Sequence, residues 1–311
     1  MRDTMELVSG VDLHFITSKK FKTNRIKMRF SAPMSTDTIA GRVLVASMLE
    51  TANEAYPTSQ IFRERLATLY GANFSTGLSR RGLIHYVDLN ISFVSDAFLS
   101  RKNTLTGEML DFLKDSLLKP LVDGRAFNRT VFEVEKKNVL NDLKAEIEDH
   151  FYHAHQELNK LFYTKQDMQI PHFATLDLVE KETPKSSFAV FQDMLQNDKI
   201  DIFFIGDFNE IEVYEHLKMF GLHPRQPELH LHYHQEFSNV LKESLERKDA
   251  HQSIVELGYH FSVQYGDRNH IPLVVLNGLL GGFAHSKLFV NIREKESLAY
   301  TISSSIDIFS G

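Results

Sequence analysis

Alternating apolar and polar positions predict strands in several parts of the chain. Residues 11–17 and 25–30 alternate over short stretches, and residues 84–93 alternate for longer, which is typical of an antiparallel strand with one buried face. A further strand is predicted over residues 73–79. Residues 200–207 are mostly apolar and end in Gly-Asp, which indicates a buried strand followed by a sharp turn.

Apolar residues at helical spacing predict helices between these strands. In the first helix, Ile39, Val43 and Ala46 share one face. The second begins at hydroxyl residues, which are typical N-terminal caps, and ends at Gly71, which is a typical stop. The predicted helices cover residues 37–53, 59–70, 97–118, 128–163 and 208–220.

A change in composition after residue 220 divides the chain. Residues 221–227 contain two prolines and one glycine, as linkers often do. We therefore predict a first α+β unit over 1–220, a linker over 221–245 and a partial second unit over 246–311. The second part is predicted to contain a strand over 253–261, helices over 272–280 and 286–295, and a strand over 299–308.

The order strand, helix, helix, strand thus occurs twice, which indicates an internal repeat. The predicted fold class is α+β, with an antiparallel-rich sheet packed by helices in the first unit. The second unit is expected to be incomplete, because the chain ends just after its last predicted strand. An unpaired sheet edge there would favour association with another chain.

Composition excludes several kinds of chemistry. The chain has no cysteine, so it has no disulfide, thiol nucleophile, thiolate zinc site or iron–sulfur cluster. A net charge of −6 is not that of a typical nucleic-acid binder. No apolar stretch approaches the roughly 18 residues that a membrane helix needs. The N-terminus has no signal-peptide pattern, and we expect a cytoplasmic protein.

One segment of the second half carries an ordered series of motifs. They are a Leu-Gly-Gly turn at 280–282, Ser-Lys-Leu-Phe at 286–289, Arg-Glu-Lys at 293–295 and Leu-Ala-Tyr at 298–300. This series resembles the second half of the inverzincin metallopeptidases, the pitrilysin or M16 family, which includes processing peptidases. The resemblance implies a clamshell of two repeated α+β units.

The same resemblance identifies where a zinc site would lie. Active members carry His-x-x-Glu-His on the first helix, with a third, acidic ligand on a later helix. Here the two histidine positions are Ser47 and Thr51, the general-base position is Glu50, and Asp142, seven residues after Glu135, takes the third-ligand position. Hydroxyl oxygens are much weaker zinc ligands than imidazole. We therefore expect no zinc, no other cofactor and no peptide hydrolysis by this chain alone.

Simpler roles exist for these acidic residues and for the second-half residues. Glu50 is also consistent with a hydrogen-bonded helix acid, and Asp142 with a surface charge pattern. The resemblance implies that Arg293 and Tyr300 bind substrate. The alternative is structural, with Arg293 paired with Glu296 and Tyr300 beginning a strand.

Two histidine groups suggest a metal site elsewhere. His150, His153 and His155 lie on one predicted helix, and His230, His232 and His234 alternate along an extended segment, so each group could share a face. Exposed polar faces are the alternative interpretation for both groups.

Three functions are consistent with the sequence. The first is a non-catalytic peptidase homologue that binds an extended peptide or unfolded polypeptide at a sheet edge, or that pairs with a catalytically complete family subunit as a homo- or heterodimer. The second is an active metallopeptidase with unusual ligands, such as His150 and His153 or Asp142. The third is a structural assembly protein.

Overall fold

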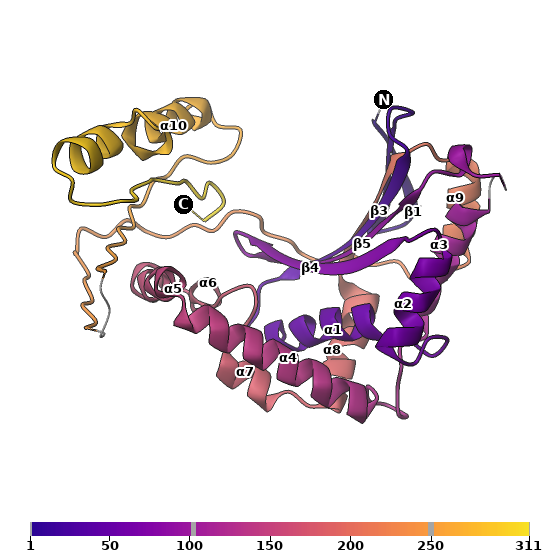
Figure 1. Cartoon of the computed structure of the whole chain (residues 1–311). Helices are drawn as coiled ribbons and strands as arrows, with labels where there is room; N and C mark the ends of the chain where they lie inside the picture. The colour runs from indigo at the N-terminus through magenta and orange to yellow at the C-terminus, as the bar shows by residue number, and fades with distance from the viewer. Residues whose placement is uncertain (1, 101–103, 248–251, 311) are drawn as a thin grey trace.

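The computed structural model describes residues 2–100, 104–247 and 252–310. The part of the chain up to residue 218 forms a six-stranded sheet covered by helices, and the last helices, from residue 270 on, lie apart from it (Figure 1). The predicted α+β class, with a mostly antiparallel sheet packed by helices, is confirmed. None of the described helices is long and apolar enough to cross a bilayer.

The strands lie in the order β1-β2-β6-β3-β5-β4. Every neighbouring pair is antiparallel except β2 and β6, which are parallel. The sequence did not predict β1, which forms a hairpin with β2 at the edge opposite β4. The strands are β1 (Arg2–Val8), β2 (Val11–Thr17), β3 (Thr23–Pro33), β4 (Asn73–Arg81), β5 (Ile84–Val94) and β6 (Lys199–Gly206).

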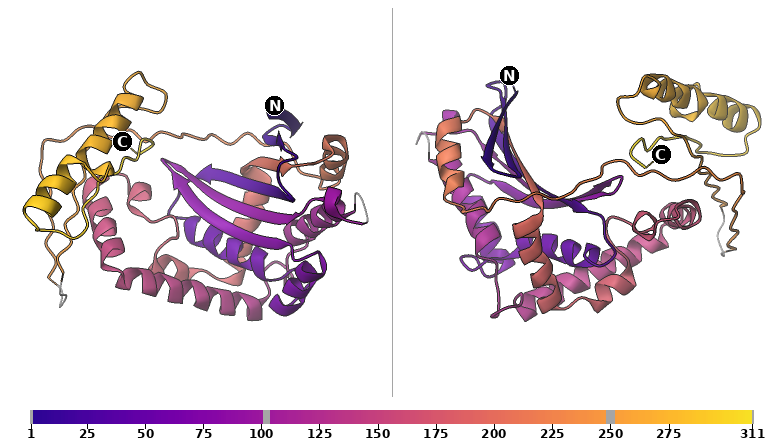
Figure 2. Two further views of the ribbon diagram at one scale, coloured as in Figure 1. Left: turned by 45° about the horizontal axis from the view of Figure 1, so that its top comes forward. Right: turned by 180° about the vertical axis from the view of Figure 1, so that it is seen from behind.

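The helices form a layer on the sheet, which Figure 2 shows from two further directions. Helix α1 contacts β4, α4 and α8, so it lies between the sheet and the outer helices. The helices of the first part are α1 (Ile39–Thr51), α2 (Ser59–Thr68), η1 (Asp96–Phe98), α3 (Leu105–Leu118), α4 (Arg129–Glu148), α5 (His150–Phe162), α6 (Gln166–Gln169), α7 (Leu176–Lys181), α8 (Pro184–Asn197) and α9 (Glu210–Lys218).

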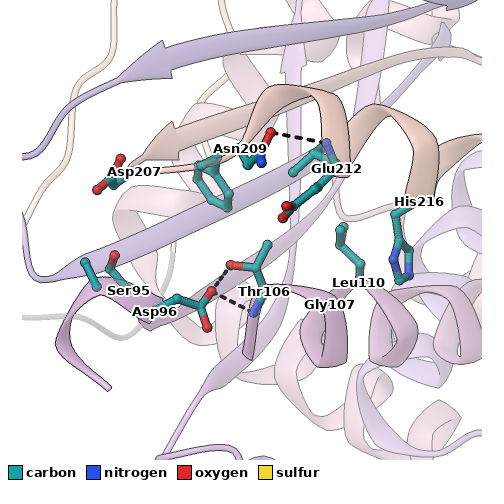
Figure 3. A pocket seen from close by; sticks show the side chains of 12 residues that line it. Ser95, Asp96, Thr106, Gly107, Leu110, Asp207, Asn209, Glu212 and His216 are labelled. Carbon is teal, nitrogen blue, oxygen red and sulfur yellow. Dashed lines mark hydrogen bonds between the residues drawn. The ribbon is translucent and has the colours of Figure 1, made fainter. Parts of the chain in front are cut away.

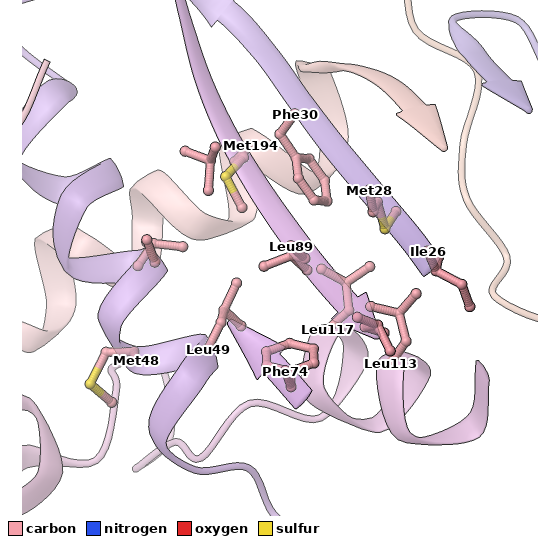
Figure 4. Packing of buried hydrophobic residues seen from close by; sticks show 14 of the residues in the cluster. Ile26, Met28, Phe30, Met48, Leu49, Phe74, Leu89, Leu113, Leu117 and Met194 are labelled. Carbon is pink, nitrogen blue, oxygen red and sulfur yellow. The ribbon is translucent and has the colours of Figure 1, made fainter. Parts of the chain in front are cut away.

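The core fills the space between this helix layer and the sheet. Met28 and Phe30 of β3 and Leu49 of α1 belong to the same core cluster, and Phe74 of β4 lies beside Leu49 and the α3 side chains (Figure 4). Phe74 also contacts Phe62 and Phe112 in edge-to-face geometry. Such burial is the main driving force for folding, and it fixes α1 against the sheet.

The prediction of one helix over residues 128–163 is wrong. The chain breaks at Asp149, whose extended backbone ends α4 and whose carboxylate accepts the N–H groups of Phe151 and Tyr152 at the start of α5. An aspartate that caps a new helix competes with continuation of the old one. The predicted helix over 97–118 is likewise shorter, because α3 begins at Leu105.

A buried charge network joins α1 to the rest of the core. Arg42 of α1 and Asp198 at the end of α8 are each 3% exposed, and the Arg42 Nη1 to Asp198 Oδ2 distance is 2.8 Å. Burial raises the pKa of Asp198, and the adjacent Arg42 opposes that rise. Arg42 Nε also donates to His85 Nδ1 at 3.0 Å, and burial together with Arg42 holds the pKa of His85 well below 6.5. His85 is therefore neutral at pH 7 and donates from Nε2 to the His172 carbonyl.

The second part has helices but no described strand. It contains α10 (His270–Asn277), a π-helical turn η2 (Gly278–Gly282) and a second π-helical segment η3 (Phe289–Lys295), so the helices predicted over 272–280 and 286–295 are confirmed in position. The division into 1–220, 221–245 and 246–311 stays a prediction.

The strands predicted over 253–261 and 299–308 are wrong in this structure. Both segments are described, and neither pairs with a strand. Val255 is 80% exposed and Leu257 is 90% exposed, so the alternation has no neighbouring backbone or core to pack on. A period-two pattern marks a strand only where another strand supplies hydrogen bonds.

The Arg42–Asp198 pair gives a stability prediction. Arg42→Met leaves the buried Asp198 carboxylate without its partner, so we expect a loss of about 3–5 kcal/mol in the free energy of unfolding. The exposed Arg65–Glu108 pair is the matched control, and Arg65→Met should cost under about 1 kcal/mol. Urea denaturation measures both, and equal losses for the two variants would contradict the assignment.

Candidate functional site

Helix α1 exposes only the three positions that the sequence singles out. Ten of its 13 residues are buried, and the three that are not are Ser47, Glu50 and Thr51. Gly41 allows this close packing, because a Cβ there would lie 2.7 Å from a methyl group of Val190 on α8. The packing of α1 thus directs these three polar residues away from the core.

The Glu50 carboxylate is bound to the edge strand of the sheet. Its Oε2 accepts the Thr76 backbone N–H at 2.7 Å and the Thr76 hydroxyl at 2.8 Å. Its Oε1 lies 3.3 Å from Arg63 Nη2 of α2. Three donors therefore surround the carboxylate, and the interpretation of Glu50 as a hydrogen-bonded helix acid fits this geometry.

The two hydroxyls at the histidine positions are turned back onto their own helix. Ser47 Oγ donates to the Val43 carbonyl at 3.4 Å, and Thr51 Oγ1 donates to the Ser47 carbonyl at 2.9 Å. Serine and threonine often make this bond within helices. A neutral hydroxyl that is donating to a carbonyl is a poor zinc ligand, so this donor set does not fit the ion.

Asp142, which the resemblance implies as the third ligand, shares a cavity with one of the two histidine positions. Asp142 of α4 and Ser47 of α1 line one cavity of about 630 Å³, together with residues of β4. We call this the β4–α4 cavity. Its lining residues are Val43, Ala46, Ser47, Thr76, Gly77, Leu78, Val139, Asp142, Leu143, Ala145, Glu146, Asp149 and Phe173. Glu50 and Thr51 are outside this lining, and Glu135 is outside it too.

A feature that the sequence did not reveal is the free edge of β4. The N–H of Thr76 and the carbonyl of Phe74, which accepts Arg63 Nη1 at 3.4 Å, point away from β5. Backbone groups alternate in direction along an antiparallel strand, so those of Leu78 and Arg80 point the same way. Within the described chain no hydrogen bond engages the Leu78 N–H, which lies beside the β4–α4 cavity.

Arg293 and Tyr300 lie together in the second part. The Arg293 guanidinium stacks on the Phe289 ring at 4.6 Å and on the Tyr300 ring at 5.1 Å. Tyr300 is 84% exposed and begins no strand, and no described ion pair joins Arg293 to Glu296. Neither side chain lines the β4–α4 cavity. Their role in substrate binding stays a prediction.

The histidine groups do not converge on a metal site. His153 pairs with Glu246 and His155 with Glu256, at different points of the following segment. His232 lies against the ring of Phe309. The residues that the structure describes contain no group of three or more histidine or acidic side chains able to hold a metal ion.

A second cavity of about 580 Å³ lies between η1, α3 and α9 (Figure 3). Its polar side chains mostly cap helices: Asp96 accepts the N–H groups of Thr104, Leu105 and Thr106, and Asn209 accepts that of Glu212. His216 is paired with Asp111 at 2.9 Å. The polar side chains of this cavity are therefore explained by helix capping and by one ion pair.

Sequence comparisons agree with the resemblance. The family model described as "Peptidase M16 inactive domain" matches residues 181–311. A Bacillus subtilis (strain 168) protein named "Probable inactive metalloprotease YmfF" is 27% identical over 303 residues, which cover 97% of this chain and 71% of the relative. "Uncharacterized zinc protease YmxG" of the same organism is 24% identical over 221 residues, 67% of this chain and 51% of that protein.

Solved structures share the fold. The crystal structure of a conserved protein from Enterococcus faecalis V583 superposes with a TM-score of 0.93 at 37% identity, covering 100% of this chain and 73% of that one. The structure of a peptidase M16 inactive domain from Pseudomonas fluorescens has a TM-score of 0.69 at 16% identity, covering 98% and 71%. The second likeness is evidence for the fold alone.

Restoring the imidazoles tests the site assignment. We expect the purified chain to hold no zinc at this site, and Ser47→His/Thr51→His to bind about one equivalent, because two imidazoles on one helix face then join the Asp142 carboxylate. Elemental analysis after dialysis measures the stoichiometry. Adding Asp142→Ala should remove the gained zinc. Zinc in the unmodified chain that Asp142→Ala removes would contradict the assignment.

Proposed function

Because the chain belongs to the M16 peptidase family, we propose that it is a non-catalytic homologue that binds an extended polypeptide along the free edge of β4. The family model that it matches and one of its two listed relatives are described as inactive. The proposal goes beyond this family membership by naming a ligand, an extended polypeptide. It also keeps the expectation of a cytoplasmic protein.

The observation that carries the proposal is the free backbone of Leu78 beside a cavity. An extended peptide can add to a sheet edge by main-chain hydrogen bonds, while pockets beside the edge accept alternate side chains. Glu50 and Arg63 already occupy the edge at Thr76 and Phe74. The available edge therefore begins at the Thr76 carbonyl and continues through Leu78.

The far end of this edge is limited by the second part of the chain. A Cβ placed on Gly82, in the turn after β4, would lie 1.8 Å from the Leu231 carbonyl oxygen and 3.0 Å from that of Phe309. Arg81 also lies over the Phe309 ring, at 5.7 Å. The open stretch is thus short and centred on Leu78, which suits a segment of a few residues.

The donor chemistry supports the non-catalytic part of the proposal. Hydrolysis by this family needs a metal-bound water and a free general base. Here the hydroxyls of Ser47 and Thr51 donate to carbonyls, and three donors hold Glu50. An active enzyme with unusual ligands is less well supported, because His150 and His153 do not line the cavity.

A second candidate is partnership with a catalytically complete family subunit. The exposure of Tyr300, with Arg293 stacked on its ring, favours this role, because an exposed aromatic ring and a cation suit contact with another chain. Edge binding and partnership use different parts of the chain, so the second does not exclude the first. Homo- or heterodimer formation belongs to this candidate.

Removing one N–H group tests edge binding. Leu78→Pro deletes the free donor at an edge position that tolerates proline, and we expect it to weaken binding of fluorescein-labelled, carboxymethylated α-lactalbumin about tenfold. Leu78→Ala, which keeps the N–H, is the matched control and should bind within about threefold of the unmodified chain. Fluorescence anisotropy gives the affinities, and thermal unfolding checks the fold. Absent binding by the unmodified chain, or equal binding by Leu78→Pro, would contradict the proposal.

A further inference from the structure

We propose that the connection between β2 and β3 binds the surface of an anionic lipid bilayer. In this arrangement the lysines of the connection contact lipid phosphates, and Phe21 enters the boundary between headgroups and acyl chains. We call residues 18–22 the β2–β3 loop. The loop contributes no residue to the β4 edge or to the β4–α4 cavity, so this site is separate from the one proposed above.

The β2–β3 loop is held at both ends. It crosses the end of β6, which lies between β2 and β3 in the sheet. The Ser18 N–H donates to the Gly206 carbonyl, and the Lys22 carbonyl accepts the first backbone N–H after β5, each at 2.9 Å. Beneath the loop, the buried Asn24 amide donates to the Asp207 carbonyl at 2.9 Å and accepts the Asp207 N–H at 3.0 Å. The fixed base leaves residues 19–22 exposed at the end of the sheet.

Four unpaired cations lie in and directly after this loop. Lys19, Lys20, Lys22 and Arg25 are exposed, and within the described chain none of them makes an ion pair or a side-chain hydrogen bond. No acidic residue occurs between positions 18 and 25. Each cation close to an anionic membrane strengthens binding about fivefold, so this cluster has the charge that such a surface requires.

The acidic residues near the loop line another surface or have a partner of their own. Asp96, Asp207 and Glu212 line the cavity between η1, α3 and α9, to which no residue of the loop contributes. Asp96 is also 8% exposed and accepts three backbone N–H groups. Glu210, at the start of α9, accepts the Thr17 hydroxyl at 3.3 Å. The loop cations therefore remain available to an anionic partner.

Exposed rings favour a lipid surface over another polyanion. Phe21 is 52% exposed, and Phe98 of η1, the turn that follows β5, is 55% exposed. Phosphate groups alone attract the lysines, whereas burial in the acyl boundary also removes apolar rings from water. Helices α3 and α9 lie on the side of the molecule away from α10 (Figures 1 and 2). Membrane contact at this end would leave the second part of the chain accessible.

Vesicle sedimentation tests the proposal with the whole chain. The vesicles contain phosphatidylcholine alone, or phosphatidylcholine and phosphatidylglycerol in equal parts. We expect the chain to bind the anionic vesicles at least about tenfold more tightly at low salt, with a smaller preference at high salt. Lys19→Gln/Lys20→Gln/Lys22→Gln should weaken binding to the anionic vesicles about a hundredfold.

The matched control removes the same charge from the outer helices. Lys137 and Lys144 of α4 and Lys185 of α8 are exposed and make no ion pair or side-chain hydrogen bond in the described chain. Lys137→Gln/Lys144→Gln/Lys185→Gln should bind the anionic vesicles within about threefold of the unmodified chain. Thermal unfolding checks that both triple variants fold.

A second pair of variants tests the ring. Phe21→Ser should weaken binding to the anionic vesicles about fivefold, because no ring then enters the acyl boundary. Phe151→Ser, which removes a ring of similar exposure on α5, should leave the affinity unchanged.

Three kinds of result would overturn the proposal. The first is absent binding to anionic vesicles, or equal binding to both kinds of vesicle. The second is an equal loss of affinity in the two triple lysine variants. The third is tighter binding to single-stranded polyuridylate than to anionic vesicles, together with vesicle binding that Phe21→Ser leaves unchanged, which would identify an anionic polymer as the partner.

Discussion

The hydrogen bonds from Thr76 to the Glu50 carboxylate are the interaction on which the site depends. They join Glu50, at the end of the mostly buried helix α1, to the edge strand β4. The bonds satisfy a backbone N–H that would otherwise be free, and they hold the carboxylate that the resemblance assigns to the general-base position. The same bonds determine where the open part of the β4 edge begins.

One structural feature holds in place both the predicted zinc positions of α1 and the cavity beside that helix. Helix α1 is fixed against the sheet by the core and by the Arg42–Asp198 pair. The space beside it persists as a cavity, and Asp142 still lines that space. The same cavity is bordered by Asp142 and Glu146 of α4 and by Thr76, Gly77 and Leu78 of β4.

The spacing of apolar residues predicted the helices and strands that bury one face in the core of the first part. The five strands between residues 11 and 206 and helix α1 were predicted from the sequence, and the motif series from Leu280 to Tyr300 indicated the family. The break at Asp149 was missed because one capping carboxylate outweighs a continuous helical pattern. Strands were wrongly predicted over 253–261 because alternation says nothing of a pairing neighbour. The direction of the Leu78 N–H depends on the register with β5, which sequence does not specify.

Amide hydrogen exchange of β4, resolved by residue, tests the central claim most directly. In the chain without ligand, the Thr76 amide should exchange slowly because Glu50 accepts its proton, whereas the Leu78 amide should exchange quickly. Addition of an extended peptide should slow exchange at Leu78 and leave Thr76 unchanged. Rapid exchange at Thr76 in the free chain, or no change at Leu78 under saturating peptide, would contradict the account.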